Sequence, residues 1–278
     1  MTAKTLTLAQ AVCLFVLPTN ATAQKPEWFL PSNHPVPTLT ADAREPRIGG
    51  RMMVITEDAT LYDGSIQAEA ILGHAQPLIR LGSISGHALV MAIQGGVFGR
   101  FRMDSIAREL ITTDWMFAIP FYVATNDLWI RLKYQHISSH IGDEYVEVFQ
   151  VSRLRANRDA VSLAVHKKLN TDFAIYGVVD VAGFVEPNGR DRWVLQAGAE
   201  WTAPIPNGSL VPFAATDFHW SQDSGWRTGL NIQAGVDLFP NERPGLRLFL
   251  NLTTGPSVMG EFHQKDETAV SLGGLIFP

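Results

Sequence analysis

The strongest constraint on the fold is a two-residue alternation of apolar and polar side chains. In residues 246–253 every second residue is leucine, and most of the residues between are polar. Residues 193–201 and 226–238 repeat the pattern. Such alternation places the apolar side chains on one face of a β-strand. Segments of about ten residues fit tilted strands that cross a membrane better than globular strands, which average about five or six residues.

The connections between these segments alternate in length along the chain. The short ones are 125–127, 170–172, 204–209 and 240–245, and the long ones are 102–113, 139–158, 186–192 and 255–267. Barrels of bacterial outer membranes have short turns at one rim and long loops at the other. Outside the N-terminus, no apolar run approaches the roughly 18 residues of a membrane helix. A spanning structure would therefore be a closed barrel.

We predict an all-β fold, a transmembrane antiparallel up-and-down β-barrel of about 12 strands (10 to 12) with an extended N-terminal arm. Ten strands follow from His87 onward, and residues 65–82 would add one more hairpin. A soluble β-sandwich or lipocalin-like cup is the alternative, with its apolar face turned inward. Strand length and loop asymmetry favour the membrane barrel.

The N-terminus has the features of a secretory signal peptide. Lys4 precedes the apolar run 8–17, and small residues follow at 21–23. We expect residues 1–23 to be the signal peptide. Proline-rich sequence then opens a periplasmic arm, predicted as residues 24–63, and the barrel follows as residues 64–278. The predicted location is the bacterial outer membrane, as an integral protein.

Composition narrows the classes of function. The formal net charge of −5 argues against a nucleic-acid partner. The single cysteine, Cys13, lies in the predicted signal peptide, which excludes disulfides and a thiolate nucleophile from the mature chain. We predict no cofactor. The expected partners are outer-membrane lipid, including lipopolysaccharide, and the machinery that assembles barrels; the oligomeric state stays open.

The stretch "YQHISSHIGDEY", residues 134–145, contains most of the reactive side chains that we single out. It continues a predicted strand that runs outward from the turn 125–127. Its even-numbered residues continue the apolar face, so His136, Ser138 and His140 should face lipid. A serine needs a neighbouring base before it attacks an ester, and residues i and i+2 of a strand share a face.

The spacing His136-x-Ser138 is similar to the His-x-Ser-Asn motif of outer-membrane phospholipase A and lipid A deacylase barrels. That resemblance implies that His136 is the base and Ser138 the nucleophile, both on the outer, lipid-facing wall. Ser139 stands where those families have Asn. Asp143 and Glu144 are the candidates for the acid that orients the base. Calcium is the ion to expect if the protein is such a hydrolase; no metal ligands are predicted otherwise.

A longer resemblance covers most of the mature chain. The segments "ADAREPR", "GGVFGRF", "YQHISSHIGDEY", "QAGAEW", "AATDFHW" and "GPSVMGEF" occur in this order. They resemble a bacterial family of predicted outer-membrane barrels catalogued as domain of unknown function 1207. The resemblance implies the fold and the location. It implies no activity.

Two functional hypotheses follow. In the first, the barrel is a structural or small-solute, transport-related envelope protein, and residues 134–145 only shape a loop. In the second, it is a surface lipid hydrolase that uses His136 and Ser138. Asp217 and His219, which share a strand face, are secondary candidates with Ser139 and His140. The lumen charges are of mixed sign, so we expect them to pair and fill the interior.

Signal-peptide removal is directly testable. We expect cleavage after Ala23, because the small residues at 21 and 23 occupy the positions that signal peptidase requires. N-terminal sequencing or intact-mass measurement of protein purified from the envelope should give Gln24 as the first residue. An envelope-embedded protein that retains Met1 would contradict this prediction.

Overall fold

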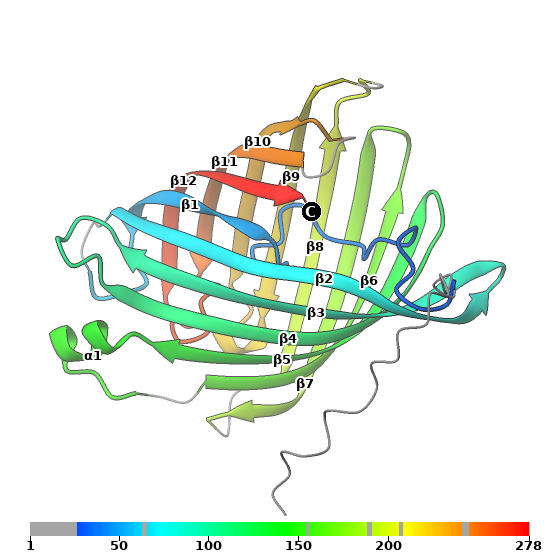
Figure 1. Cartoon of the computed structure of the whole chain (residues 1–278). Helices are drawn as coiled ribbons and strands as arrows, with labels where there is room; N and C mark the ends of the chain where they lie inside the picture. The colour runs from blue at the N-terminus through cyan, green and yellow to red at the C-terminus, as the bar shows by residue number, and fades with distance from the viewer. Residues whose placement is uncertain are drawn as a thin grey trace, which may run out of the picture.

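The computed structural model describes residues 27–62, 66–153, 156–187, 191–205, 208–240 and 245–277. The predicted signal peptide lies outside these ranges. The described chain forms a closed barrel of twelve antiparallel strands, in which each strand pairs with the next and β1 pairs with β12 (Figure 1). The predicted all-β barrel of about 12 strands is therefore confirmed.

The elements follow one another as an up-and-down meander. The strands are Ile48–Glu57 (β1), Ile66–Ile84 (β2), His87–Arg102 (β3), Leu110–Ala124 (β4), Leu128–Ile141 (β5), Ala156–Lys168 (β6), Phe173–Glu186 (β7), Trp193–Thr202 (β8), Leu210–Ser221 (β9), Thr228–Leu238 (β10), Gly245–Pro256 (β11) and Asp266–Phe277 (β12). The helix α1 is Asp143–Phe149, and the short 3-10 helix η2 is Gln222–Ser224. In the described part of the chain no helix is long and apolar enough to cross a membrane.

The structure corrects the predicted start of the barrel. Residues 65–82 do not form a hairpin, because Ile66–Ile84 is one strand of 19 residues. The remaining strand is β1, Ile48–Glu57, which we had assigned to the arm. Several residues on both faces of β1 are apolar and two are glycine, so its sequence alternates weakly. The barrel thus begins at Ile48.

Gly73 and Pro77 made β2 resemble two strands joined by a turn. A Cβ atom on Gly73 would lie 2.7 Å from the Pro46 Cβ of the arm, so the missing side chain allows a close approach within a continuous strand. Pro77 lies at a register shift between β2 and β3, where a proline without an N–H group is tolerated. Both residues have structural roles other than a turn.

The outer face of the barrel wall is apolar and the inner face is polar, which is the reverse of a soluble protein. Large apolar side chains are exposed on the exterior of every strand; examples are Met52, Leu72, Leu132, Leu250 and Leu272. Charged and amide side chains are buried in the lumen; examples are Arg51, Gln67, Glu69, Gln94, Arg100, Arg131, Asp217 and Glu267. A soluble cup would have the reverse arrangement.

The two rims differ in their connections. The described residues at the long-loop rim are 58–62, 103–109, 142–153, 187, 191–192, 222–227 and 257–265, and those at the short-turn rim are 85–86, 125–127, 169–172, 203–205, 208–209 and 239–240. At the long-loop rim, Tyr145 of α1 packs edge to face against Tyr62, with ring centroids 5.4 Å apart. The Tyr145 hydroxyl accepts a hydrogen bond from the Leu61 amide (2.9 Å), and burial raises the pKa of this phenol.

The arm, residues 27–47, runs from the short-turn rim into the lumen. Its start pairs with β2, where the Leu30 amide donates to the Leu78 carbonyl at 2.7 Å. Deeper in, Glu45 is 1% exposed and accepts hydrogen bonds from Arg131 at 2.8 and 3.0 Å. Gln94 donates to the same carboxylate at 2.8 Å. The arm is therefore fixed to β2, β3 and β5 of the wall.

Other lumen charges are paired as well. Arg100, which has no exposed surface, forms ion pairs with Glu267 and with Glu69. Arg247 binds Asp237 through two hydrogen bonds of 2.6 and 2.9 Å. Groups of this kind need such partners because an unpaired buried charge costs several kcal/mol. The expectation that lumen charges pair with one another agrees with these contacts.

The contact between Glu45 and Arg131 should determine how firmly the arm is held. Replacement of Glu45 by alanine leaves the Arg131 guanidinium buried without its carboxylate partner, which should lower the free energy of unfolding by roughly 3–5 kcal/mol. Urea unfolding in detergent or lipid measures the change. Glu27→Ala, at an exposed residue of the same arm, is the control and should have an effect under about 0.5 kcal/mol. Equal stability of both variants would contradict this role.

Candidate functional site

The strand β5 has the face assignment that its sequence predicted. Arg131 and Lys133 are buried in the lumen, whereas Ile130 and Leu132 are exposed on the exterior. Because side chains alternate along a strand, the even-numbered residues His136, Ser138 and His140 follow Ile130 and Leu132 on the exterior wall. They lie in the half of β5 next to the long-loop rim.

Two hydrogen-bonded pairs form on this exterior face. The Ser138 hydroxyl lies 3.0 Å from Nε2 of His140. Nδ1 of His136 lies 2.5 Å from Oδ1 of Asp159, on the neighbouring strand β6. The side chains of His136 and Asp159 are 44% and 32% exposed, so both remain accessible from outside the barrel. The serine thus stands between two imidazoles, one bonded to it and one bonded to a carboxylate.

Asp159 is the site residue that sequence reasoning missed. It reaches His136 because the two residues are directly opposite in the register between β5 and β6. Asp159 precedes Val161 and Leu163, which are exposed on the same exterior face of β6. The sequence contained one sign of this role: Asp159 is an acidic residue on the apolar face of a predicted strand, and that strand follows the strand of His136 in the chain.

The acids nearest in sequence lie elsewhere. Asp143 and Glu144 begin α1 and are exposed at the long-loop rim. Asp143 forms an ion pair with Arg153 at 2.6 Å, and both side chains are largely exposed. The structure brings Asp159, and neither of these two, to the ring of His136. Ser139 lies on the opposite face of β5, is 2% exposed, and packs in the lumen against Gly260.

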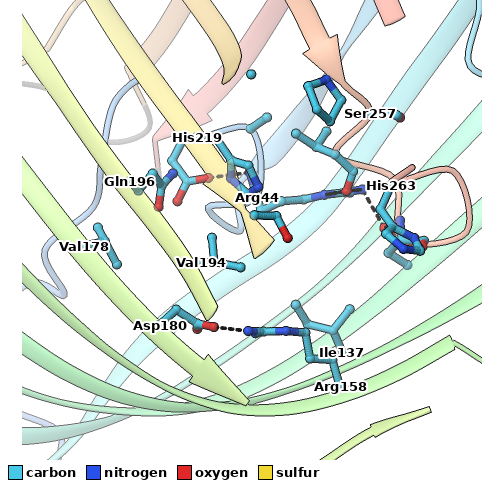
Figure 2. A pocket seen from close by; sticks show the side chains of 18 of the residues that line it. Arg44, Ile137, Arg158, Val178, Asp180, Val194, Gln196, His219, Ser257 and His263 are labelled. Carbon is cyan, nitrogen blue, oxygen red and sulfur yellow. Dashed lines mark hydrogen bonds and ion pairs between the residues drawn. The ribbon is translucent and has the colours of Figure 1, made fainter. Parts of the chain in front are cut away.

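Asp217 and His219 face the lumen and are separated from the exterior serine by the barrel wall. They line a cavity of about 210 Å³ that opens between the inner faces of the strands and the tip of the arm (Figure 2). Oδ2 of Asp217 accepts hydrogen bonds from the Tyr176 hydroxyl at 2.6 Å and from Gln196 at 2.8 Å. The secondary candidates therefore belong to a different site.

The wall of this cavity combines ion pairs with apolar patches. Arg158 pairs with Asp180, and Val178 and Val194 form an apolar surface beside them (Figure 2). The Arg44 guanidinium, from the arm, donates to the Val258 carbonyl at 2.9 Å. Among the residues that the structure describes, no group of three or more His, Cys, Asp or Glu side chains is arranged to hold a metal ion.

The fold and the polarity of its wall define a class, the closed antiparallel barrels of outer-membrane type. The family model described as "Protein of unknown function (DUF1207)" matches residues 4–274. The chain belongs to this family. No curated protein sequence matches it.

Solved structures share the fold at low sequence identity. The chain is similar to outer membrane phospholipase A from Escherichia coli, with a TM-score of 0.56 and 12% identity over 83% of this chain and 90% of that one. It is also similar to the Salmonella typhi outer membrane phospholipase dimer with bound calcium, with a TM-score of 0.57 and 14% identity over 83% and 90%. At this identity the similarity extends to the fold alone.

Proposed function

We propose that the protein is an integral β-barrel of the bacterial outer membrane, with the short-turn rim in the periplasm. The apolar exterior supports this location, because only a nonpolar medium stabilises the large apolar side chains that are exposed on every strand. Closure through β1 and β12 supports it as well, since a barrel in lipid has no unpaired edge. Both β1 and β12 have their periplasmic ends at the short-turn rim, where Ile48 pairs with Ile276.

An arginine in the middle of the exterior wall tests the membrane location. Leu250, at mid-strand in β11, is 60% exposed. Leu250→Arg should destabilise the barrel in lipid by about 2–4 kcal/mol, since a charge near the bilayer midplane is poorly solvated. Leu169→Arg, at a similarly exposed turn residue of the short-turn rim, is the control and should cost about 0–1 kcal/mol. Equal costs in urea titrations with lipid vesicles would contradict a membrane-facing wall.

The function that the exterior site supports best is hydrolysis of ester bonds in envelope lipids. The observation that carries this proposal is the line of His136, Ser138 and His140 on the outer wall, with Asp159 bonded to the first imidazole. A nucleophile, a base and an acid that orients the base are the three parts of serine-hydrolase chemistry. All of them would face the acyl chains of surrounding lipid.

We assign the base role to His136, because its ring has the carboxylate partner. The bond from Nδ1 to Asp159 fixes the tautomer that leaves Nε2 free to accept a proton. Ser138 bonds to His140 in the structure, and rotation to another staggered χ1 rotamer would turn its hydroxyl toward His136. His140 is then a positioning residue that holds the resting serine.

The reaction would follow the two-step course of acyl transfer. Ser138 Oγ attacks the ester carbonyl carbon while its proton passes to His136 Nε2. The carbon–oxygen bond of the tetrahedral intermediate then breaks, the alcohol leaves with that proton, and the acyl group stays on Ser138. Water attacks the acyl-enzyme, transfers a proton through His136 to the serine oxygen, and releases the fatty acid. Asp159 stabilises the imidazolium formed in each step.

Apolar side chains beside the serine favour an acyl substrate. Trp115 and Phe117 of β4 lie directly opposite Ser138 and His136 in the register with β5, and are 54% and 43% exposed. An acyl chain packed on these rings would present its ester to Ser138 from the lipid side. The substrate class is therefore an acylated lipid of the outer leaflet. Lipopolysaccharide and phospholipid both fit this description.

Purified protein in mixed micelles should release fatty acid from such lipids. Ser138→Ala and His136→Ala should each lower the rate by about 10³-fold or more, and Asp159→Ala by roughly 10²- to 10⁴-fold. Ser139→Ala, on the lumen face of the same strand, is the matched control and should retain activity. Titration of fatty acid, together with covalent labelling by a fluorophosphonate, measures both turnover and the nucleophile.

Each outcome has a defined meaning. Unchanged release by Ser138→Ala would remove Ser138 as the nucleophile and end the hydrolase proposal. Loss of activity in His140→Ala but not in His136→Ala would exchange the roles of the two imidazoles and leave the reaction class intact. Phospholipid and lipopolysaccharide substrates, assayed separately, distinguish the two sources of acyl ester.

The structural or transport-related alternative is supported by the cavity in the lumen. A wide diffusion channel is not expected, because the arm occupies the lumen. The cavity of about 210 Å³ above the tip of the arm nevertheless offers room for a small solute.

A further inference from the structure

The lumen cavity contains charged groups that the protein leaves without a partner of opposite sign. Asp217 is 4% exposed, and its contacts are the neutral donors Tyr176 and Gln196. Asp42, at the tip of the arm, accepts a hydrogen bond from the Arg44 amide at 2.8 Å. Within the described ranges neither carboxylate forms an ion pair. Both line the cavity.

These two acids line one cavity from different parts of the chain. Asp217 is in β9, and Asp42 is in the arm. Two other acids of the cavity wall have cations: Asp114 pairs with Arg44, and Asp180 with Arg158. Two carboxylates on one cavity wall without a direct ion pair attract a positive group, because burial makes uncompensated charge costly.

The described part of the cavity wall also contains a cation without a direct ion pair. Lys133 of β5 is 7% exposed and lines the same cavity. In the described part of the chain its ammonium group makes no hydrogen bond and no ion pair; Glu45, Asp42 and Asp180 act on it only at longer range, and Glu45 is bonded to Arg131. A buried ammonium with three unused donors suits an anionic or strongly accepting group.

We propose that the lumen cavity binds a small amphoteric molecule, with its ammonium group at Asp217 and Asp42 and its carboxylate at Lys133. In this proposed complex the charges of the ligand pair with these groups, and its carbon chain packs on Val178 and Val194, which line the cavity (Figure 2). The imidazole of His219, which lines the same region, adds a hydrogen-bonding group beside the ammonium end. The class is that of amino acids and related short amino-carboxylates.

The site is independent of the exterior serine. It faces the lumen, whereas Ser138 faces outward, so failure of the hydrolase proposal leaves this one untouched. It gives the arm a second role: the arm fills the lumen below the cavity and supplies Asp42 to the ligand. A barrel with such a site would bind or transport a specific solute, whereas an open pore would let many solutes diffuse through.

A set of four-carbon probes separates the contributions of the two ends. The probes are 4-aminobutyrate, putrescine, butyrate and 1,4-butanediol, each added to the folded full-length barrel in detergent during calorimetric titration. 4-Aminobutyrate should bind at least about 10-fold more tightly than the other three. Putrescine should bind more weakly because its second ammonium meets Lys133, and butyrate because its methyl end meets the two carboxylates.

Variants at the two ends should change this order in opposite directions. Asp217→Asn keeps the shape and the contacts to Tyr176 and Gln196 but removes the charge, and it should weaken 4-aminobutyrate binding by about 10- to 100-fold. Lys133→Met should reverse the preference so that putrescine binds as well as or better than 4-aminobutyrate. Asp172→Asn, in the turn 169–172 at the other rim, removes one charge away from the cavity and should bind like the parent protein.

Several results would overturn the proposal. Binding of 1,4-butanediol as tight as that of 4-aminobutyrate would show that charge is not recognised. Unchanged affinity for 4-aminobutyrate in Asp217→Asn would also reject the proposal, and so would the absence of binding of every probe to the folded barrel. If Asp217→Asn fails to fold, Asp42→Asn tests the second carboxylate from the arm and should weaken 4-aminobutyrate binding. Unchanged affinity in that variant would then reject the site.

Discussion

Hydrogen-bonded closure of the sheet is the constraint on which the rest of the structure depends. The pairing of β1 with β12, continuous from Ile48 to Glu57 apart from one irregularity, leaves no strand edge unpaired. Once the sheet is closed, each strand has one face in the lumen and one face outside, and the two-residue alternation of the sequence decides which side chains go where. The apolar exterior, the polar lumen and the two separate sites all follow from this division.

Closure of the barrel buries many polar side chains in the lumen. A barrel of this size encloses polar side chains that water alone would have to solvate, and the arm replaces much of that water. Glu45 bonds to Arg131 and Gln94, and Asn231 donates to the Ala41 carbonyl, so residues far apart in sequence neutralise and satisfy one another. Three charged groups that form no ion pair among the described residues, Asp42, Asp217 and Lys133, line the remaining cavity.

The fold was largely predictable, and the candidate site only in part. Alternation and loop length give the strands from His87 onward, and parity along β5 gives the exterior position of His136 and Ser138. The first two strands were harder to predict. Both faces of β1 contain apolar residues, and Gly73 in β2 is a glycine because the arm passes close to it, and it does not mark a turn. Such a reason depends on a contact with a distant segment, which no local pattern contains.

By itself, the sequence determined the period of the strands, the face of each side chain and the rim at which the reactive residues lie, since these depend on the fixed two-residue geometry of a β-strand. Only the tertiary structure decided which residues meet across strands. The register between β5 and β6 brings Asp159, in place of Asp143 or Glu144, to His136, and the path of the arm brings Asp42 to the cavity that Asp217 lines. Register and arm position depend on the hydrogen bonding and packing of the whole closed barrel, because a shift of one residue would turn every side chain to the other face.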